Sequence, residues 1–388
     1  MTELRITAGF LPLLDSLLLV VAREKGLAAA QGIDLMLVRE TSWANIRDRV
    51  AVGHFDVAHM LGPMPIAANL GLFPIDVPLL APMTLGLGGN AITVSTGLWQ
   101  RMLDAGASSS LDPASTGAAL HKVVAAGGPR LRFAVTHPHS GHNYELRYWL
   151  AASGVAPDRD VDLAILPPPL MADALGSGAI DGYCVGEPWN SAGVAAGAGR
   201  IVTVKARLWT NSPDKVLGAS ARWTEQHPEA LAALLRALYA ASVWCNDPAN
   251  HAEAAGILSA PAYLGRPSEL LLRGLSGRLE LIRGEAVRVP DFYQPHANSA
   301  TFPWITHALW YYSQMVRWSD VPYSAENARR AAQTYRPDIY RAAVAPFGAA
   351  LPTRDLKPLD ATAFFDGAAF DPDALEDYIA RQAALITP

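Results

Sequence analysis

Apolar and polar positions follow two periods along the first part of the chain. Short apolar runs over 4–8, 33–38 and 55–60 have the length of buried strands, and stretches with helical spacing over 16–25 and 45–52 lie between them. Strands that alternate with helices at this spacing predict βαβ units and a mostly parallel sheet. We expect the strand over 33–38 to be buried on both faces, because it is apolar over most of its length.

The alternation continues further along the chain and then changes character. Strand-like apolar runs follow over 91–95, 131–135, 161–166 and 201–204. From Thr224 onward the pattern becomes helical. The sequence there predicts helices over 228–245, 298–318 and 372–386, the last with Asp371 as its N-cap and Pro372 as its first residue.

Two stretches, 53–63 and 178–188, share one design. Each begins with a Gly, has an Asp three positions on and a Pro ten positions on, and carries a short apolar run between Asp and Pro. Gly permits close backbone approach and Pro cannot donate a ladder hydrogen bond, so each stretch predicts a strand that opens into a loop. Ligands of open α/β sheets bind at the carboxyl ends of strands. We therefore expect two α/β lobes with a ligand site in the cleft between them.

The strand over 91–95 is expected to leave the first lobe, and we predict the following domain boundaries. Lobe I comprises residues 1–94 and 213–388 and includes a helical C-terminal part, and lobe II comprises residues 95–212. The chain has 388 residues, of which 51% are hydrophobic and 17% are charged, so it can bury two cores of this kind.

Composition narrows the classes of function. The net charge is −5 and no run is rich in Lys or Arg, which argues against direct nucleic-acid binding. The two cysteines, Cys184 and Cys245, lie far apart in apolar surroundings, so we expect buried free thiols and no CxxC motif. No Walker-type, Ser-His-Asp or GxGxxG arrangement is present. We therefore expect no enzyme activity, no cofactor and no metal.

The apolar stretch over 10–22 superficially resembles the core of a secretion signal. Pro12 and Asp15 interrupt it, and no small-residue cleavage site follows. No apolar run of about 18 residues, the length that would span a bilayer, occurs elsewhere. We expect no export and no membrane insertion, and we predict a cytoplasmic localisation.

A set of motifs in a fixed order carries a likeness to one family. The motifs are TSWANIRD (41–48), AHMLGPMP (58–65), HNYELRYWLAASG (142–154), CVGEPW (184–189), PDKVLG (213–218), FFDG (364–367) and FDP (370–372). Together they resemble the nitrate- and bicarbonate-binding branch of ABC-transporter substrate-binding proteins over nearly the whole chain. The resemblance implies a two-lobed α/β clamp of the periplasmic-binding-protein type (type II), with mostly parallel sheets, flanking helices and a helical C-terminal extension.

The resemblance also implies which residues contact a small planar anion. Carried over position by position, they are Trp43, Asn90, His142, Pro168, Val185, Gly186 and Lys215. Nitrate-binding members have a glutamine in a Gly-Gln-Gly turn where this chain has Gly88-Gly89-Asn90. The side-chain amide of Asn90, one position further along the chain, would then replace that of the glutamine.

These residue types suit a flat, singly charged oxyanion that carries no proton. The indole N–H of Trp43 only donates, Lys215 supplies a cation, and Gly186 lets backbone amides approach the ligand. His142 stands where a helix is predicted to begin, which adds the positive end of a helix dipole. Bicarbonate or hydrogen phosphate would also require an acceptor. Glu187 is the nearby candidate, although we expect its turn to point it elsewhere.

Without the resemblance these residues have plainer interpretations. Trp43 would be a core anchor, Lys215 a solvated surface residue, and 186–188 a simple turn. The three histidines within 137–142 have a spacing that could chelate zinc, but the loop lacks the Cys or carboxylate ligands that zinc sites usually include. His59 lies on an apolar strand and is expected to be a core histidine with its hydrogen bonds satisfied.

Three functions of different classes follow from these observations. We favour a cytoplasmic nitrate/nitrite sensor, which would bind the anion in the interlobe cleft and release an RNA-binding ANTAR-domain antiterminator. The alternative is a periplasmic ABC-transporter substrate-binding protein for nitrate, nitrite or bicarbonate. A clamp-fold enzyme of the pyrimidine-synthase type is disfavoured. Such enzymes have cysteine-rich sites with a Schiff-base lysine, whereas the two cysteines of this chain lie far apart.

Overall fold

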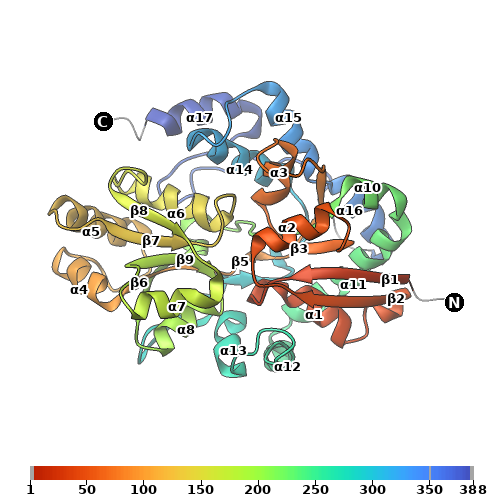
Figure 1. Cartoon of the computed structure of the whole chain (residues 1–388), viewed down its shortest axis with the longest axis horizontal. Helices are drawn as coiled ribbons and strands as arrows, with labels where there is room; N and C mark the ends of the chain where they lie inside the picture. Colours follow the sequence, from red (N-terminus) through yellow and green to blue (C-terminus); the bar gives the residue numbers. More distant parts are fainter. Residues whose placement is uncertain (1–3, 349–350, 385–388) are drawn as a thin grey trace. The chain divides into compact units, whose positions relative to one another are not determined.

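The computed structural model describes residues 4–348 and 351–384. Within them the chain forms two compact units, each with a five-stranded sheet at its centre (Figure 1). Unit 1 comprises residues 1–87, 213–269 and 294–358, and unit 2 comprises residues 88–212, 270–293 and 359–388. Each unit is an α/β layer structure, in agreement with the predicted fold class.

The sheet of unit 1 has the strand order β2-β1-β3-β11-β4. The strands are β1 (Leu4–Phe10), β2 (Ile33–Arg39), β3 (Val57–Leu61), β4 (Leu79–Thr84) and β11 (Lys215–Ser220). β1 is parallel to β2 and β3, but β11 is antiparallel to both β3 and β4. Four of the five strands therefore run in one direction, as predicted, and β11 is the exception, because it joins the sheet after the chain has built most of unit 2 and not through a βαβ crossover.

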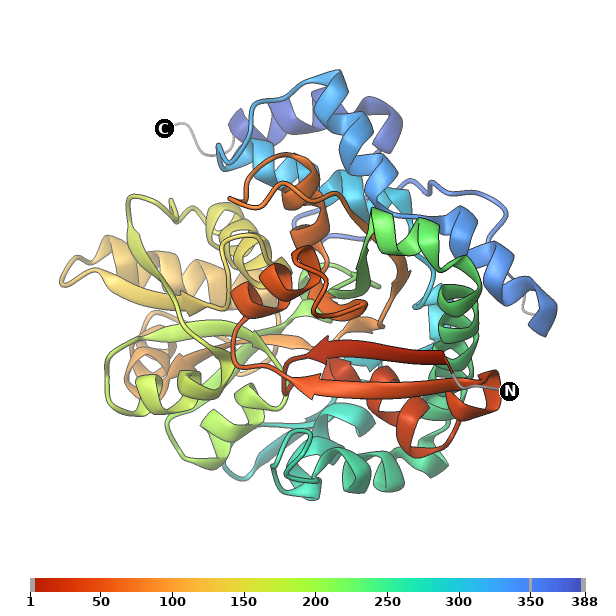
Figure 2. The same cartoon turned by 45° about the vertical axis from the view of Figure 1, so that its right-hand side comes forward.

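Helices cover both faces of this sheet. The chain steps from β1 to β2 through α1 (Leu17–Glu24) and back past β1 to β3 through α2 (Trp43–Ala51). Right-handed crossovers in opposite directions place the two helices on opposite faces, as Figure 1 shows. Figure 2 shows the long α11 beside α16 in the same unit. The further helices are α3 (Pro63–Asn69), α10 (Ala221–Gln226), α11 (Pro228–Asn246), α12 (His251–Leu258), α14 (Ile305–Arg317), α15 (Ala325–Thr334) and α16 (Pro337–Val344).

The strand predicted over 33–38 forms as β2, but it is not buried on both faces. It lies at the edge of the sheet, where Ile33 and Leu35 are buried and Met36 is 37% exposed. Side chains alternate between the two faces of the sheet, and along β2 the row that includes Asp34 and Met36 is less buried than the row that includes Ile33 and Leu35. The apolar composition of this run misled the prediction.

The sheet of unit 2 has the order β10-β6-β9-β7-β8. Its strands are β6 (Asn90–Ser95), β7 (Leu131–Val135), β8 (Val161–Ile165), β9 (Gly182–Gly186) and β10 (Gly199–Val204). β7 is parallel to β8 and β9, but β6 is antiparallel to β9 and β10. This sheet is therefore also mixed, with the antiparallel strand where the chain enters the unit.

Helices and a small hairpin complete unit 2. They are α4 (Thr96–Asp104), α5 (Pro113–Ala125), α6 (Gly141–Ala152), α7 (Met171–Gly176), α8 (Trp189–Ala195), α9 (Lys205–Leu208), α17 (Leu375–Ala384), and the hairpin of β12 (Arg278–Ile282) with β13 (Glu285–Arg288). Helix α13 (Ser268–Ser276) precedes the hairpin. The core includes Trp149, whose indole N–H donates to the carbonyl of Pro113 at 2.9 Å.

The assignment of all of 213–388 to lobe I differs from the observed division. Arg200 of β10 pairs with Glu285 at 2.9 Å, which attaches the 270–293 segment to unit 2. The hydroxyl of Tyr148 donates to the carboxylate of Asp366, and Phe364 stacks on Trp209 at 5.3 Å between ring centroids. These contacts join positions that are far apart in sequence, so no local sequence pattern predicts them.

The repeated Gly…Asp…Pro design corresponds to the same construction in both units. The Asp56 carboxylate, just before β3, accepts the backbone N–H of Thr7 at 2.8 Å. The Asp181 carboxylate, just before β9, accepts the backbone N–H of Arg132 at 2.8 Å. In each unit the Asp thus fastens the start of one strand to its parallel neighbour, and the strand then runs to a loop and a helix at its carboxyl end.

Two of the predicted C-terminal helices begin later than expected. The helix predicted over 298–318 starts at Ile305, because Asn298 and Ser299 have left-handed φ angles of 58° and 56° and Pro303 excludes a regular helix before it. The last helix, α17, starts at Leu375, and the part of the prediction beyond residue 384 lies outside the described residues. Within 4–348 and 351–384, no helix combines the length and apolarity needed to cross a membrane.

We predict that Gly62→Ala destabilises the protein. Gly62 connects β3 to α3, and its N–H donates to the carbonyl of Asp214 at 2.8 Å. A Cβ at this position would lie 2.9 Å from that carbonyl oxygen, from the Tyr311 ring and from the Tyr335 hydroxyl. We expect the free energy of unfolding to fall by about 1–3 kcal/mol, the usual cost of overpacking, measured by urea denaturation.

Gly97→Ala is the matched control. Gly97 lies in α4, and a Cβ there would meet nothing within 4 Å. This variant should be as stable as the wild type or more stable by about 0.5–1 kcal/mol, because alanine loses less backbone entropy in a helix. Equal urea midpoints for Gly62→Ala and the wild type would contradict the packing argument.

Candidate functional site

Trp43 is the first residue of α2 and is buried to 2% exposure. The helix starts here because Ser42 caps it, with its hydroxyl accepting the N–H of Asn45 at 3.2 Å. The indole ring lies 5.3 Å from the imidazole of His59 and 5.6 Å from Nζ of Lys215. Its Nε1 has no hydrogen-bond partner among the described residues. A buried donor of this kind is open to an acceptor from a ligand.

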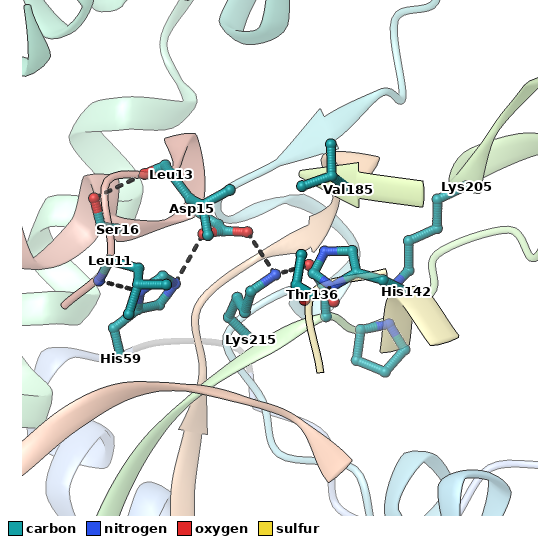
Figure 3. Close-up of polar contacts among 12 residues, drawn as sticks. Leu11, Leu13, Asp15, Ser16, His59, Thr136, His142, Val185, Lys205 and Lys215 are labelled. Carbon is teal, nitrogen blue, oxygen red and sulfur yellow. Dashed lines mark hydrogen bonds and ion pairs between the residues drawn. The ribbon is translucent and has the colours of Figure 1, made fainter. Parts of the chain in front are cut away.

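Lys215 is the first residue of β11 and is buried, not solvated. Its ammonium group lies 2.9 Å from Oδ2 of Asp15 (Figure 3). It also pairs with the carboxylate of Asp214. Burial alone would lower the pKa of Lys215, but the two carboxylates outweigh it and raise that pKa. Burial would likewise raise the pKa of Asp15, and the charge of Lys215 and the hydrogen bond from His59 hold it below its usual range.

His59 has the satisfied core environment that the sequence predicts. It is fully buried, with Nε2 at 2.8 Å from Oδ1 of Asp15 and Nδ1 at 3.4 Å from the backbone N of Leu11 (Figure 3). Sequence reasoning missed that Asp15 and Asp214 belong to the same cluster. The sequence did contain one signal. Asp15 lies inside an apolar run, and a carboxylate that is buried there requires a buried partner.

In unit 2, Asn90, Val185 and Gly186 come together through strand register. Asn90 begins β6 and pairs with Gly186, the last residue of β9, and Val185 pairs with the next residue of β6. Asn90 is fully buried, and neither its Oδ1 nor its Nδ2 has a hydrogen-bond partner among the described residues. The Val185 carbonyl accepts Nδ2 of Asn190 at 2.8 Å. The side chain of Asn90 is therefore a second buried polar group open to a ligand.

His142 is the second residue of α6, at the helix start that the sequence predicts. Ser140 caps this helix by accepting the N–H of Asn143 at 3.0 Å. The His142 ring is buried, and its Nδ1 lies 3.0 Å from the hydroxyl of Thr136. Pro168, also buried, begins the short helix η3 (Pro168–Leu170) that follows β8. Trp43 and Lys215 belong to unit 1, and the other five predicted residues belong to unit 2.

The histidines near His142 have local partners. Nδ1 of His137 accepts the backbone N–H of His139 at 3.0 Å, and Nδ1 of His139 lies 3.0 Å from the hydroxyl of Tyr144. Over residues 4–348 and 351–384, no three His, Cys, Asp or Glu side chains are grouped so that they could hold a metal ion. The geometry therefore gives no support to a zinc site at this loop.

Glu187 follows β9 directly and is turned into the unit, as expected. Its carboxylate accepts the backbone N–H of Ser191 at 3.2 Å, in the first turn of α8. The side chain is 1% exposed. Burial raises the pKa of Glu187 to about 7, and the hydrogen bonds from Ser191 and the charge of Arg273 offset only part of the effect. This carboxyl group is thus partly protonated near neutral pH.

Fold and site together define a class of protein. Two α/β units, each with helices around a five-stranded sheet, have the fold of the periplasmic-binding-protein class. Solved structures agree: the chain matches the crystal structure of the periplasmic nitrate-binding protein NrtA from Synechocystis PCC 6803 with a TM-score of 0.90, at 27% identity and 97% coverage of both chains. Sequence places it within that class. Residues 2–259 match the NMT1-like family, and the chain belongs to it.

Curated relatives extend the comparison over nearly the full chain. The nitrate/nitrite binding protein NrtA of Synechococcus elongatus is 33% identical over 387 residues, which are 96% of this chain and 85% of that protein. The bicarbonate transport ATP-binding protein CmpC of Synechocystis is 34% identical over 96% of this chain, which spans 54% of that longer protein. These names describe binding and transport rather than catalysis.

We predict that Glu187→Gln changes how stability depends on pH. The folded-state pKa of about 7 lies above the ordinary value of 4.5, so between these values the folded chain keeps a proton that the unfolded chain releases. Stability from this group is full below pH 4.5 and is lost as pH rises through 7. The shift corresponds to about 3 kcal/mol. Gln mimics the protonated acid, so the variant should gain stability relative to wild type by about that amount between pH 4.5 and pH 8.

The measurement is chemical denaturation at a series of pH values. Glu376→Gln, at an exposed position on α17, removes a carboxylate without altering a buried one and should follow the wild-type curve. A constant difference between Glu187→Gln and the wild type at every pH would contradict this prediction, because it would mean that Glu187 has the same pKa in the folded and unfolded chain.

Proposed function

We propose that this chain is the ligand-binding component of an ABC importer and that its ligand is nitrate or nitrite. The proposal combines the relatives' names with the chemistry of the residues described above. Nitrate-binding proteins resemble the chain over nearly its whole length in sequence and in fold. The residues expected to contact the anion include two buried groups that lack a partner within the described residues, Trp43 and Asn90.

The unpartnered indole N–H of Trp43 is the observation that carries the proposal. An empty buried donor costs roughly 1–3 kcal/mol of stability, because it has lost water and gained no acceptor. Trp149 shows the ordinary alternative in the same chain, since its indole N–H donates to a backbone carbonyl. A buried donor without a protein acceptor can donate a hydrogen bond to a ligand, and each oxygen of an oxyanion is a hydrogen-bond acceptor.

Nitrate fits the donor character of these groups. Its oxygens accept and it carries no proton near neutral pH, so the indole N–H of Trp43 in unit 1 and the amide N–H of Asn90 in unit 2 are each of the kind that donates to such an anion. The first turn of α6, where His142 stands, provides the positive end of a helix dipole. The carboxylate that follows β9, that of Glu187, is turned away to Ser191.

Bicarbonate is the second candidate, and one observation favours it. Oδ1 of Asn90 is buried without a donor among the described residues, and the hydroxyl of bicarbonate could supply one, whereas nitrate could not. A relative named for bicarbonate transport is 34% identical to the chain. Titration with both anions distinguishes the two ligands.

The more specific sensor function stays a prediction. The comparisons support an importer component better, because the relatives are named as nitrate-binding and transport proteins. Co-purification with and without nitrate tests whether anion binding releases an ANTAR-domain antiterminator. Cell fractionation tests the cytoplasmic localisation. Co-purification that nitrate abolishes would favour the sensor.

We predict that Trp43→Phe weakens nitrate binding while the unliganded protein stays folded. Phenylalanine keeps an aromatic ring beside His59 and removes the unpartnered donor together with one ring of the buried indole, so a moderate loss of stability is also expected. The loss of a hydrogen bond to an anion should weaken binding by roughly 10- to 100-fold. Calorimetric titration measures the affinity, and thermal unfolding measures stability.

The control is Trp149→Phe, which removes an indole N–H that has a protein acceptor. It should lower stability, because the Pro113 carbonyl loses its donor, and leave nitrate affinity unchanged. If one anion takes donors from both units, as the sequence predicts, Asn90→Leu weakens binding as well. A wild-type chain that binds none of nitrate, nitrite and bicarbonate would refute the proposed function.

A further inference from the structure

Four buried side chains of unit 1 form one continuous polar cluster. Nε2 of His59 lies 2.8 Å from Oδ1 of Asp15, and Oδ2 of the same carboxylate lies 2.9 Å from Nζ of Lys215. Lys215 also pairs with Asp214. Figure 3 shows Asp15 joined by dashed lines to both His59 and Lys215. All four side chains are at most 5% exposed.

His59 contributes hydrogen bonds to the cluster. The backbone N–H of Leu11 donates to its Nδ1, and its Nε2 lies beside Asp15. Lys215 carries one positive charge, and Asp15 and Asp214 carry two negative charges. The formal sum of these three groups is −1.

A formal charge of −1 is unexpected beside Trp43, which we propose to bind an anion. Lys215 lies over the ring of Trp43 and was expected to supply positive charge to the ligand. Its charge is already shared between two carboxylates. The donors of this region can therefore hydrogen-bond to an anion while the local charge does not attract one strongly.

We propose that Asp15 and Asp214 are specificity-determining residues, which set the local charge so that singly charged oxyanions bind and doubly charged ones are rejected. The inference rests on the proposed function and deepens it. The cost of taking an ion out of water rises with the square of its charge, so a dianion loses roughly four times as much hydration energy as a monoanion of the same size. A site recovers this hydration energy only if it has a net positive charge. The carboxylates of Asp15 and Asp214 offset the positive charge of Lys215.

The two carboxylates act through Lys215 rather than by touching the ligand. Replacing Asp214 by Asn keeps a side chain of the same shape and removes one of the two carboxylates paired with Lys215. The local charge then rises from −1 to 0. A dianion gains twice as much from this change as a monoanion, because the interaction energy is proportional to the ligand's charge. Selectivity should change more than the affinity for any monoanion.

Chlorate and sulfite form a matched pair of probes for this test. Both are pyramidal ions with three oxygens, and at a pH where sulfite is fully ionised they differ by one charge. We expect the wild type to bind nitrate and chlorate and to reject sulfite. In Asp214→Asn the ratio of chlorate to sulfite affinity should fall by roughly tenfold or more, measured by calorimetric titration at one fixed pH.

Asp34→Asn is the control for net charge. Asp34 lies on β2 and pairs with Arg5 at the surface, so its removal changes the chain's charge equally without touching the cluster. Its selectivity should equal that of the wild type. Asp15→Asn is the second test variant, and thermal unfolding checks that each protein is folded.

The outcomes separate this inference from the proposed function. Nitrate binding with an unchanged chlorate-to-sulfite ratio in the folded Asp214→Asn and Asp15→Asn variants overturns the inference and leaves the proposed function standing. A wild-type chain that binds no monoanion overturns both. A shift in selectivity without loss of nitrate binding supports the charge mechanism, because a merely structural role would weaken all ligands alike.

Discussion

The burial of Lys215 between two carboxylates is the constraint that organises unit 1. An ammonium group without solvent must be paired, and its partners come from the loop after β1 and from the residue before β11. His59 of β3 completes the hydrogen bonds of Asp15. Three separate segments of the chain therefore have to meet at one point before the charge is compensated. Trp43 is held against the same cluster through its contacts with His59 and Lys215.

The antiparallel strands explain why Lys215 and Asn90 lie near the other predicted contacts of their own units. Lys215 begins β11 and pairs with Leu61 at the end of β3, and Asn90 begins β6 and pairs with Gly186 at the end of β9. A strand that runs opposite to its neighbour starts where that neighbour ends. Had β6 and β11 been parallel to their neighbours, both residues would lie at the amino ends of the sheets. The mixed topology is thus part of the site.

Local sequence patterns could predict the strands and the repeated Gly…Asp…Pro design, because their causes lie within a few residues. The strand over 131–135 has the predicted bounds, and both Asp residues of the design bond to a neighbouring strand. The strand directions and the place of the 270–293 segment depend on distant contacts, such as that of Arg200 with Glu285. Periodicity carries no information about which distant residue will be a partner.

The same limit applies to the candidate site, where the chemistry depends on which buried groups lack partners. Trp43 and Trp149 are alike as sequence letters, yet one indole N–H is open and the other donates to Pro113. Leaving donors such as those of Trp43 and Asn90 open lowers the stability of the empty protein, and an oxyanion returns that free energy when it binds. Because two carboxylates already offset the charge of Lys215, binding depends on hydrogen bonds rather than on net attraction. Such a site favours an anion that is weakly hydrated and singly charged, because little hydration energy has to be recovered.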